Sequence, residues 1–503
     1  MDLLSNHLLT LVLFVPTAAA VALFLIPARS EKGLTWFAFG ASILSFLLSL
    51  VVWMRFVPAQ SGFQLQEQVA WYPAVNATYH LGIDGLSLTM VLLTTFLTPL
   101  AILASNHIKE RLKPYLQLFL LLETGMLGVF LSLDLLLFFV FWEVGLVPMY
   151  FLINQWGGQN RNYASLKFIL FTLGGSLGLL LAIQLMGVVT GTYDLVVLIA
   201  KWPTIHGVII PGIDTSFIKS VAFFAFVIAF SVKVPVFPFH TWLPDAHTEA
   251  PTAGSMILAG VLLKLGAYGF LRLVLPLFPN EASQYAWVLA GLATLAIILG
   301  ALGAWGQNDF KRLVAYSSIN HMGFVILGIA VAARAQGTQD AVIAVNGAVL
   351  QMLMHGLSSA GMFFLVGVVY ERAHTRDLNN FGGLLAILPK YGGILIFMSM
   401  ASLGLPGMGG FVSEFLVVRG AFPVFMLATC LSAIGLFFTG VYVLKALKLV
   451  LHGPLNERWV GKLTDITWRE IAIVTPLMLL LLLTGIYPAW IMDLINRATM
   501  FWF

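Results

Sequence analysis

Residues 226–239 read FVIAFSVKVPVFPF, which places a lysine and two prolines inside a strongly apolar run. A helix that spans a bilayer needs about 20 mostly apolar residues. A lysine inside such a helix costs at least ~2.5 kcal/mol, and each proline removes a backbone donor. A bilayer tolerates the interrupted backbone only where it is buried in protein or lines a cavity. The stretch therefore predicts a membrane helix that is broken beside a buried charge, Lys233.

The composition extends this interpretation to the whole chain. Of 503 residues, 60% are hydrophobic and 10% are charged, whereas roughly 25% are charged in an average soluble domain. Counting apolar runs predicts an all-α polytopic membrane protein with about 14 transmembrane helices. The first run, from Leu8 to about Leu25, lacks a basic flank. That absence favours a spanning helix over a cleaved signal peptide.

Charge and cysteine content argue against several other functions. The net charge is only +4, and the basic residues form no stripe, so we expect no nucleic-acid partner. The single cysteine, Cys430, lies in an apolar run and provides neither a disulfide nor a cysteine ligand set for an iron–sulfur cluster. The sequence contains no phosphate-binding glycine motif in a strand–helix setting. We therefore expect this chain to bind no cofactor itself.

The distribution of Lys and Arg residues predicts the orientation in the membrane. Most of those outside the apolar runs fall on one side, which the positive-inside rule assigns to the cytoplasm. Both termini are then expected outside. On this interpretation Lys219 and Arg272 lie in outer loops and Lys311 lies in an inner loop.

Ionisable residues recur inside the apolar runs, and their cost makes each a functional candidate. In addition to Lys233 they are Glu143, Lys264, His321 and Glu414, with Glu123, His355 and Lys445 as further candidate relay residues. Lys445 stands within a turn of Lys448, so its side chain could instead extend to the interface. His355 could equally be a hydrogen-bonded core histidine.

A second broken helix is predicted where LPGMGG at 405–410 precedes Glu414. The expected helix breaks are at Pro235, Pro238, Pro406, Gly407, Gly409 and Gly410. The separation is 181 residues from Lys233 to Glu414 and from Lys264 to Lys445, and 178 residues from Glu143 to His321. Because five is an odd number of crossings, a second copy of a five-helix unit has the opposite orientation in the membrane. The spacing therefore predicts two inverted repeats, each with a broken helix.

The predicted organisation follows from this offset. Helices 1–3 occupy residues 1–113, and a cytoplasmic connection with the final helix occupies 452–503. The first repeat, helices 4–8, covers 114–276, and the second, helices 9–13, covers 286–451.

A switch is predicted between Glu143 and Lys233. A close opposite charge favours the charged form of a buried lysine, whereas burial alone favours the neutral form. A paired Lys233 therefore holds its proton, and when the pair opens the proton can pass toward Lys264.

Two clusters of polar residues have simpler explanations. The segment HTWLPDAHTEAP at 240–251 holds His240, Asp245, His247 and Glu249, but its spacing matches no zinc motif, and we expect no metal there. For Lys167, near the start of its helix, a structural role is favoured.

Several runs resemble a known family. They are HLGIDGLSL at 80–88, FFVFWEVGLVPMYFLI at 138–153, PVFPFHTWLPDAHTEAPT at 235–252, AYSSINHMGF at 315–324 and SLGLPGMGGFVSEF at 402–415. The chain resembles the antiporter-like membrane subunits of respiratory complex I, the proton-pumping NADH:quinone oxidoreductase. Glu414 favours the chain 4 type, also called subunit M, because the other antiporter-like chains typically carry lysine there.

The resemblance implies an enzyme subunit that translocates protons without redox chemistry of its own. It assigns the proton path to Glu143, Lys233, Lys264, His321 and Glu414. It also implies NADH, FMN, iron–sulfur clusters and quinone elsewhere in the complex. The implied partners are other membrane-arm subunits, including two further antiporter-like chains, and the expected location is a bacterial inner membrane.

Three alternatives stay open at this point. The same superfamily includes subunits of multisubunit sodium/proton antiporters, and it includes the ferredoxin-driven photosynthetic complex I. A third hypothesis makes the chain a scaffold, in which buried charges pair only to fix helix register.

Overall fold

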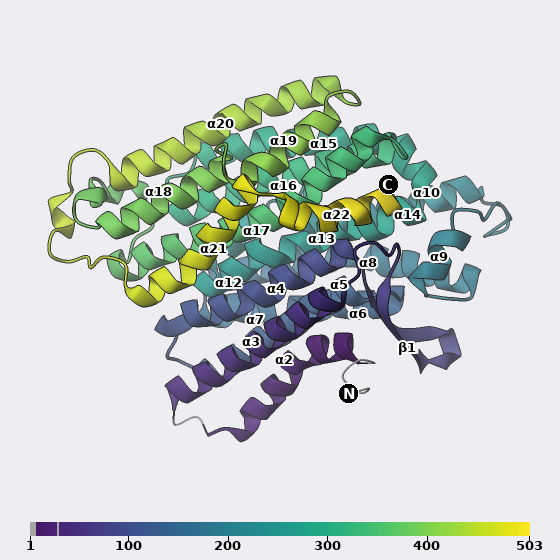
Figure 1. The fold of residues 1–503 in the computed structure, drawn as a ribbon, viewed down its shortest axis with the longest axis horizontal. Helices are drawn as coiled ribbons and strands as arrows, with labels where there is room; N and C mark the ends of the chain where they lie inside the picture. The colour runs from purple at the N-terminus through teal and green to yellow at the C-terminus, as the bar shows by residue number, and fades with distance from the viewer. Residues whose placement is uncertain (1–6, 28–29) are drawn as a thin grey trace.

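The structure, a computed structural model, describes residues 7–27 and 30–503. Long helices lie side by side along one axis of the molecule (Figure 1). Within the described residues, 13 helical segments are long and apolar enough to cross a membrane. The prediction of a polytopic helical membrane protein is thereby confirmed.

The membrane-crossing segments account for most of the chain. They are α2 (Leu8–Leu25), α3 (Glu31–Arg55), α4 (Gly85–Ala104), α5 (Leu112–Leu131), α6 (Leu135–Val144) with α7 (Leu146–Trp156), α8 (Arg161–Thr190), α10 (Thr215–Lys233), α12 (Thr252–Ile257) with α13 (Leu263–Gly269) and α14 (Leu275–Leu277), α15 (Pro279–Trp305), α16 (Phe310–Arg334), α17 (Gln339–Ala373), α20 (Met426–Leu451) and α21 (Trp468–Ile486). The pair α18 (Pro389–Leu403) and α19 (Gly409–Ala421) forms a further interrupted crossing, in which each half is too short to span alone.

Smaller elements complete the fold. They are strands β1 (Gln64–Tyr72) and β2 (Ala77–Ile83), helices α9 (Leu195–Lys201), α11 (Trp242–Glu249) and α22 (Ala489–Trp502), and the π-helical segments η3 (Leu258–Leu262) and η4 (Phe270–Val274). We call the end of the bundle with the strands the hairpin end and the opposite end the loop end; they lie right and left in Figure 1.

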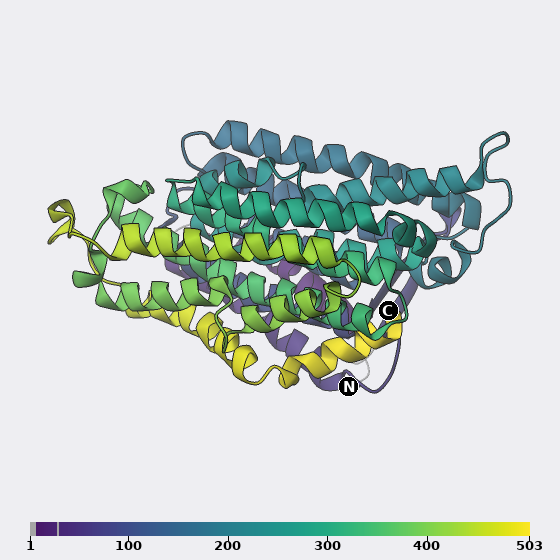
Figure 2. The ribbon, with the colours of Figure 1, turned by 90° about the horizontal axis from the view of Figure 1, so that it is seen from above.

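The most deeply buried crossings lie in the middle of the bundle. They are α4, α5, α12–α14, α16 and α17, whereas α3, α8, α20 and α21 lie at the periphery. Seen from above, the helices between residues 161 and 233 and the C-terminal helices border opposite sides (Figure 2). The central helices are therefore shielded from the bilayer by the outer ones.

Both predicted helix breaks are present. Helix α10 ends at Lys233, and the chain becomes helical again at Trp242, with Pro235 and Pro238 between. Helix α18 ends at Leu403, and the chain between it and α19 holds Pro406 and Gly407. The repeat boundaries at 114–276 and 286–451 stay a prediction.

Gly409 and Gly410 lie outside the second break and begin α19 instead. They are required there for packing, since a Cβ at Gly410 would lie 2.8 Å from the carbonyl oxygen of Ala401. A third interruption was not predicted: α6 ends at Val144, and α7 begins at Leu146.

The chain is mostly helical, but it also contains one segment that the count of apolar runs does not predict, the antiparallel hairpin β1–β2. Strand β1 begins with the polar run Gln64–Gln68, interrupted by Leu65, and its register shifts between Gln64 and Glu67. The strands are too short to span a membrane and fall between apolar runs, so counting runs misses them.

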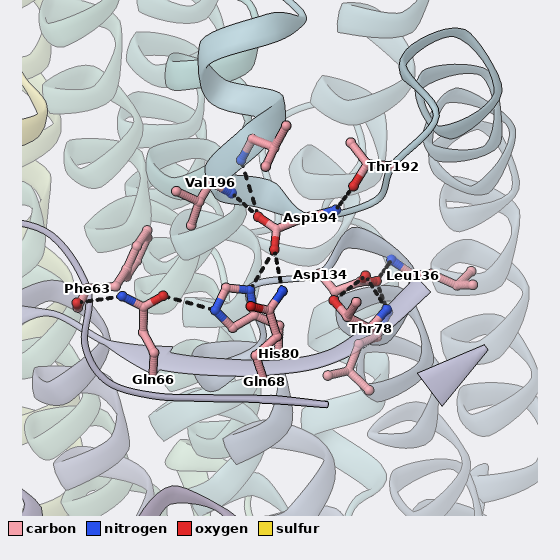
Figure 3. Close-up of polar contacts among 12 residues, drawn as sticks. Phe63, Gln66, Gln68, Thr78, His80, Asp134, Leu136, Thr192, Asp194 and Val196 are labelled. Carbon is pink, nitrogen blue, oxygen red and sulfur yellow. Dashed lines mark hydrogen bonds and ion pairs between the residues drawn. The ribbon is translucent and has the colours of Figure 1, made fainter. Parts of the chain in front are cut away.

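Two aspartates fasten the hairpin to the bundle (Figure 3). Asp194 accepts hydrogen bonds from the backbone of Val196 and Val197 at the start of α9, while its other oxygen lies 2.8 Å from Nδ1 of His80. Asp134 caps α6 and also accepts the backbone N–H of Thr78 at 2.9 Å. Each carboxylate therefore joins a helix start to strand β2.

We predict that Asp194→Asn loosens the hairpin. Burial raises the pKa of Asp194, but the hydrogen bonds from His80 and the backbone outweigh this and hold the pKa below its usual value. A carboxyl group whose pKa is lower in the folded than in the unfolded state stabilises the fold at pH values above the ordinary aspartate pKa. This stabilisation is lost as the pH falls through the pKa of the folded state. Asparagine can still cap α9, but the hydrogen bond with His80 loses its charge, which costs ~1 kcal/mol, so amide exchange in residues 64–83 should accelerate about fivefold at neutral pH.

Hydrogen–deuterium exchange measures the effect, with Asp214→Asn as the control. Asp214 also precedes a helix, but its side chain makes no cap hydrogen bond to α10. Equal exchange of residues 64–83 in the two variants would contradict the anchoring role.

Candidate functional site

Lys233 occupies the end of α10, where the first break begins. Its side chain is 3% exposed, and its Nζ has no hydrogen-bond partner. The Nζ instead lies 4.3 Å from the ring centroid of Trp142. A cation is favoured both over an indole face and at the carboxyl end of a helix. The site therefore supports a charged Lys233 without fixing it by a hydrogen bond.

Glu143 neighbours Trp142 on α6, at the start of the interruption near Gly145. Its Oε1 is buried and unpartnered. Glu143 and Lys233 act on each other electrostatically, but they form no ion pair within 4.0 Å among the described residues. Glu143 and Lys233 are thus not in direct contact, and the switch between them stays a prediction.

Lys264 lies at the centre of the bundle on α13 and is fully buried. Its Nζ donates to the carbonyl oxygen of Ala259 at 2.5 Å, within the π-helical segment η3, and to Nδ1 of His355 at 2.8 Å. π-helical turns shift the backbone pairing and are frequent at functional sites. His355 is therefore a hydrogen-bonded histidine whose partner is Lys264, and its role as a relay stays a prediction.

His321 and Glu414 form the next pair, which joins α16 to α19. Nδ1 of His321 lies 2.8 Å from Oε1 of Glu414. Gln351 donates to the same oxygen at 3.0 Å and accepts the hydroxyl of Ser413. The hydroxyl of Tyr442 lies 3.3 Å from Nε2 of His321. Both ring nitrogens and the carboxylate therefore have fixed partners.

The two pairs approach each other through their histidines. The rings of His321 and His355 have centroids 5.7 Å apart, and Nε2 of His355 is buried without a partner. A cavity of about 20 Å³ adjoins both rings and is lined by hydroxyl groups from Ser317, Ser358 and Ser399. A polar cavity needs roughly 10–15 Å³ to hold one water molecule. One water therefore fits beside the histidine pair.

Close backbone contacts hold the helices that carry these groups. A Cβ at Gly266 on α13 would lie 2.8 Å from the carbonyl oxygen of Phe230 on α10. A Cβ at Gly347 on α17 would lie 2.6 Å from the backbone nitrogen of Val417 on α19. Glycine thus brings the helices of Lys233 and Lys264 together, and likewise those of His355 and Glu414.

Two of the further candidate relay residues, Glu123 and Lys445, form no hydrogen bond with these pairs. Glu123 on α5 is fully buried, with both carboxylate oxygens unpartnered. Lys445 donates to the carbonyl oxygens of Trp305 and Gln307, each at 2.8 Å, at the loop end. Lys445 thus follows the interfacial alternative, and nothing in its contacts supports a relay role.

The polar residues around α11 have separate partners. Asp245 pairs with Lys167 at 2.6 Å, and Glu249 accepts the backbone N–H of Asn160 at 3.0 Å. His247 is fully buried, stacks on Phe363 and has no partner for either ring nitrogen. No group of three or more His, Cys, Asp or Glu side chains suited to a metal occurs in the part of the chain that the structure describes.

Three basic residues that were assigned to loops are buried instead. Arg272, in η4, is 1% exposed and pairs with Asp84 at 2.5 Å. Lys219, in α10, donates to Pro203 at 2.9 Å, and Lys311, in α16, donates to Ala250. All three residues belong to helices, and the side of the membrane on which each lies stays a prediction.

Sequence reasoning missed the side chains that position the site. Trp142, Gln351 and Tyr442 carry no charge, so their position in an apolar run gives no signal. His247 was considered only as part of a metal motif, and its burial becomes visible only in the fold.

These observations define a class of protein. A membrane bundle carries buried lysine and glutamate side chains at helix breaks or beside a π-helical segment, and buried histidine side chains on the uninterrupted helices α16 and α17. Such groups in such a place mark an ion path through the membrane.

Comparison with known proteins identifies the family. Residues 132–439 match the family described as "NADH:quinone oxidoreductase/Mrp antiporter, TM", and residues 8–134 match "NADH-ubiquinone oxidoreductase chain 4, amino terminus". The chain is 42% identical to NADH-quinone oxidoreductase subunit M of Rhodobacter capsulatus, over 98% of this chain and 96% of that protein. The chain belongs to the NADH-quinone oxidoreductase subunit M family.

Two solved structures share the fold. One is a chain of respiratory complex I from Thermus thermophilus with bound NADH, with a TM-score of 0.85, 28% identity and coverage of 98% of this chain and 99% of that chain. The other is a chain of the Mrp complex from Dietzia sp. DQ12-45-1b, with a TM-score of 0.82, 21% identity and coverage of 99% and 97%. The second likeness shows the fold alone.

We predict that the indole face beneath Lys233 is needed for ion movement. Trp142→Leu removes that face and the hydrogen bond from Nε1 to Ser176, whereas Trp142→Phe keeps an aromatic face. A cation–π contact in a desolvated site contributes ~2 kcal/mol. We expect proton pumping to fall about tenfold or more in Trp142→Leu and less in Trp142→Phe.

Acidification of inside-out vesicles at matched levels of assembled complex measures this. Equal losses in the two variants would assign the effect to the Ser176 hydrogen bond instead.

Proposed function

We propose that this chain carries protons across the membrane, as a membrane-arm subunit of a NADH:quinone oxidoreductase, along an axis from Glu143 to Glu414. One observation supports this route above all. Lys264 hydrogen-bonds His355, and His321 hydrogen-bonds Glu414, with the two histidine rings side by side. Four ionisable side chains from α13, α16, α17 and α19, the last of which follows the second break, thus lie close together inside the bundle.

The chemistry of the route rests on the cost of an unpaired charge. A charge at the bilayer centre costs at least ~2.5 kcal/mol, so a proton that reaches Lys264 remains only while a neighbour or water stabilises it. His355 accepts a hydrogen bond from that lysine through Nδ1 and carries a proton on its unpartnered Nε2. A proton accepted at Nδ1 can be matched by release from Nε2 toward the serine-lined cavity.

Glu414 and His321 form the terminal pair. The carboxylate accepts from Gln351 and lies against His321, so a proton arriving at His321 neutralises the pair or passes to Glu414. Tyr442 fixes the ring from the other side. Gln351, Ser413 and Tyr442 are positioning residues, because each acts by orienting His321 or Glu414.

The open Glu143–Lys233 arrangement is one state of the proposed switch. When the two groups approach, Lys233 is stabilised as a cation; when they separate, the indole face alone supports it. Helices α10 and α13 are in backbone contact at Gly266, so movement at the break is transmitted to the helix of Lys264. Water molecules bridge Lys233 to Lys264 in this proposal.

The redox chemistry belongs to other subunits. NADH, FMN, iron–sulfur clusters and quinone are held elsewhere in the proposed complex, and two further antiporter-like chains are among its membrane-arm partners. We place the complex in a bacterial inner membrane with both termini of this chain outside. The similarity to bacterial subunit M proteins supports the location, and the Lys and Arg distribution supports the orientation.

A sodium/proton antiporter subunit is the second candidate. The fold shared with the Mrp complex favours it. This function needs the same buried axis but no electron donor, so the two candidates differ in what drives the ions.

We predict that Lys233→Ala and Glu143→Ala lower both proton pumping and NADH-dependent quinone reduction about tenfold or more, since coupled steps stop together. Lys462→Ala, an exposed control, should leave both unchanged. The measurement is pumping and quinone reduction in membranes with assembled complex. Unchanged NADH oxidation with lost sodium tolerance would favour the antiporter, whereas intact pumping in Lys264→Ala would favour the scaffold hypothesis.

We predict that His355→Ala separates the two halves of the axis. The change removes the only side chain that the structure places in contact with Nζ of Lys264 among the described residues. Pumping should fall about tenfold or more, and His355→Gln, which keeps a polar group, should lose less. His452→Ala, on the exposed loop after α20, is the matched control.

Vesicle acidification across pH 6–8 tests the role, because a relay shifts the pH profile whereas a packing role lowers the rate uniformly. A uniform loss in both His355 variants would show that the histidine only packs.

A further inference from the structure

An apolar groove runs along the bundle between α3, α4, α17, α21 and α22. It has a volume of about 330 Å³. Its lining includes Leu50, Trp53, Leu92, Leu357, Leu480 and Trp490. The polar side-chain groups among the lining residues are the hydroxyl of Thr89, which donates to the carbonyl oxygen of Gly85 at 2.7 Å, and the indole N–H groups of Trp53 and Trp490, of which the second donates to Thr484 at 3.3 Å. The rest of the lining offers hydrocarbon contacts.

The groove leads toward a polar pocket at the hairpin end. The pocket has a volume of about 220 Å³. It is bordered by the end of α3, the start of α4 and the C-terminal part of α22, three of the helices that also border the groove. Along α22 the lining passes from Ile491 in the groove to Leu494 and Arg497 in the pocket. Groove and pocket thus form one seam, apolar inside the membrane and polar at its edge.

The pocket contains a positively charged side chain, Arg497. Arg497 is exposed and forms no ion pair with any residue that the structure describes. The carboxylate of Asp84 also borders the pocket, but Arg272 and the indole N–H of Trp502 occupy its Oδ2. The net attraction in the pocket is therefore for an anion.

The lining and the charge together favour one kind of occupant. The groove is lined almost entirely by apolar side chains, and the positive charge lies beyond one end of it, in the pocket. A molecule that is apolar along its length and anionic at one end matches this arrangement. The tilted rings of Trp53 and Trp490, with centroids 6.2 Å apart, suit the level where hydrocarbon meets headgroups.

We propose that this seam binds one anionic phospholipid, with an acyl chain in the groove and its phosphate beside Arg497. The lipid would pack against the face of α17 that lies opposite His355. Leu353 and Leu357 of α17 line the groove, and His355 lies between them in sequence and contacts Lys264 on the other side of the helix. The binding itself does not depend on the proton route.

The test uses the assembled complex in native membranes. The probe is a phosphatidylglycerol that carries a photoreactive diazirine in its acyl chain, and cross-linked peptides are identified by mass spectrometry. Labelling near Leu50 and Leu480 should exceed labelling near Leu444, an exposed residue of α20, at least fivefold. Leu480→Trp should fill the groove and lower that labelling, whereas Leu444→Trp should not.

The headgroup is tested separately with Arg497→Gln. One arginine near an anionic headgroup contributes about a fivefold preference, so the variant should label equally with phosphatidylglycerol and phosphatidylcholine probes. Arg334→Gln, at the exposed end of α16, is the control. Equal labelling of groove and α20, or cross-links from the groove to another subunit in place of lipid, overturns the proposal. If Arg497→Gln does not change the preference for the phosphatidylglycerol probe, the proposal of an anionic headgroup beside Arg497 is wrong.

Discussion

The rest of the structure depends on the electrostatic cost of placing Lys264 in the centre of a membrane protein. A cation there must have a partner, because hydrocarbon offers none. The chain meets this requirement with the carbonyl of Ala259 and the ring of His355. The carbonyl belongs to a π-helical segment, and the histidine belongs to α17, one of the two most deeply enclosed crossings. The outer helices then serve to keep lipid away from this contact.

The same constraint explains why the polar groups come in linked pairs. Glu414 and His321 are hydrogen-bonded to each other, and Gln351 occupies the remaining capacity of the carboxylate oxygen. Lys233 is the exception, since it rests on the face of Trp142 without a hydrogen bond. A group held loosely beside a break in its helix is free to exchange partners, whereas a fully bonded pair is not. The loosely held lysine and the tightly held glutamate therefore suit the control and the end of a proton route, respectively.

Away from the axis, the bundle is closed at the hairpin end by polar contacts of another kind. Asp134 and Asp194 each cap a helix and bond the same strand, so the hairpin is fixed to the start of α6, the helix that carries Glu143. Arg272, Asp84 and Trp502 close the centre of that end. The apolar seam beside them shows that the periphery is not uniformly packed against lipid and has at least one shaped recess.

By itself the sequence determined the spanning helices, two of the helix breaks and several of the buried charges, because hydropathy, proline and the cost of a charge in hydrocarbon are local properties. Lys233, Lys264, His321 and Glu414 could be chosen on that basis alone. Tertiary structure decided which of them meet: His355 joins Lys264, whereas Lys445, equally charged, turns to carbonyls at the loop end. It also decided the roles of Trp142, Gln351 and Tyr442, and the burial of Arg272. Such contacts arise between helices distant in the chain, and uncharged partners leave no mark on hydropathy.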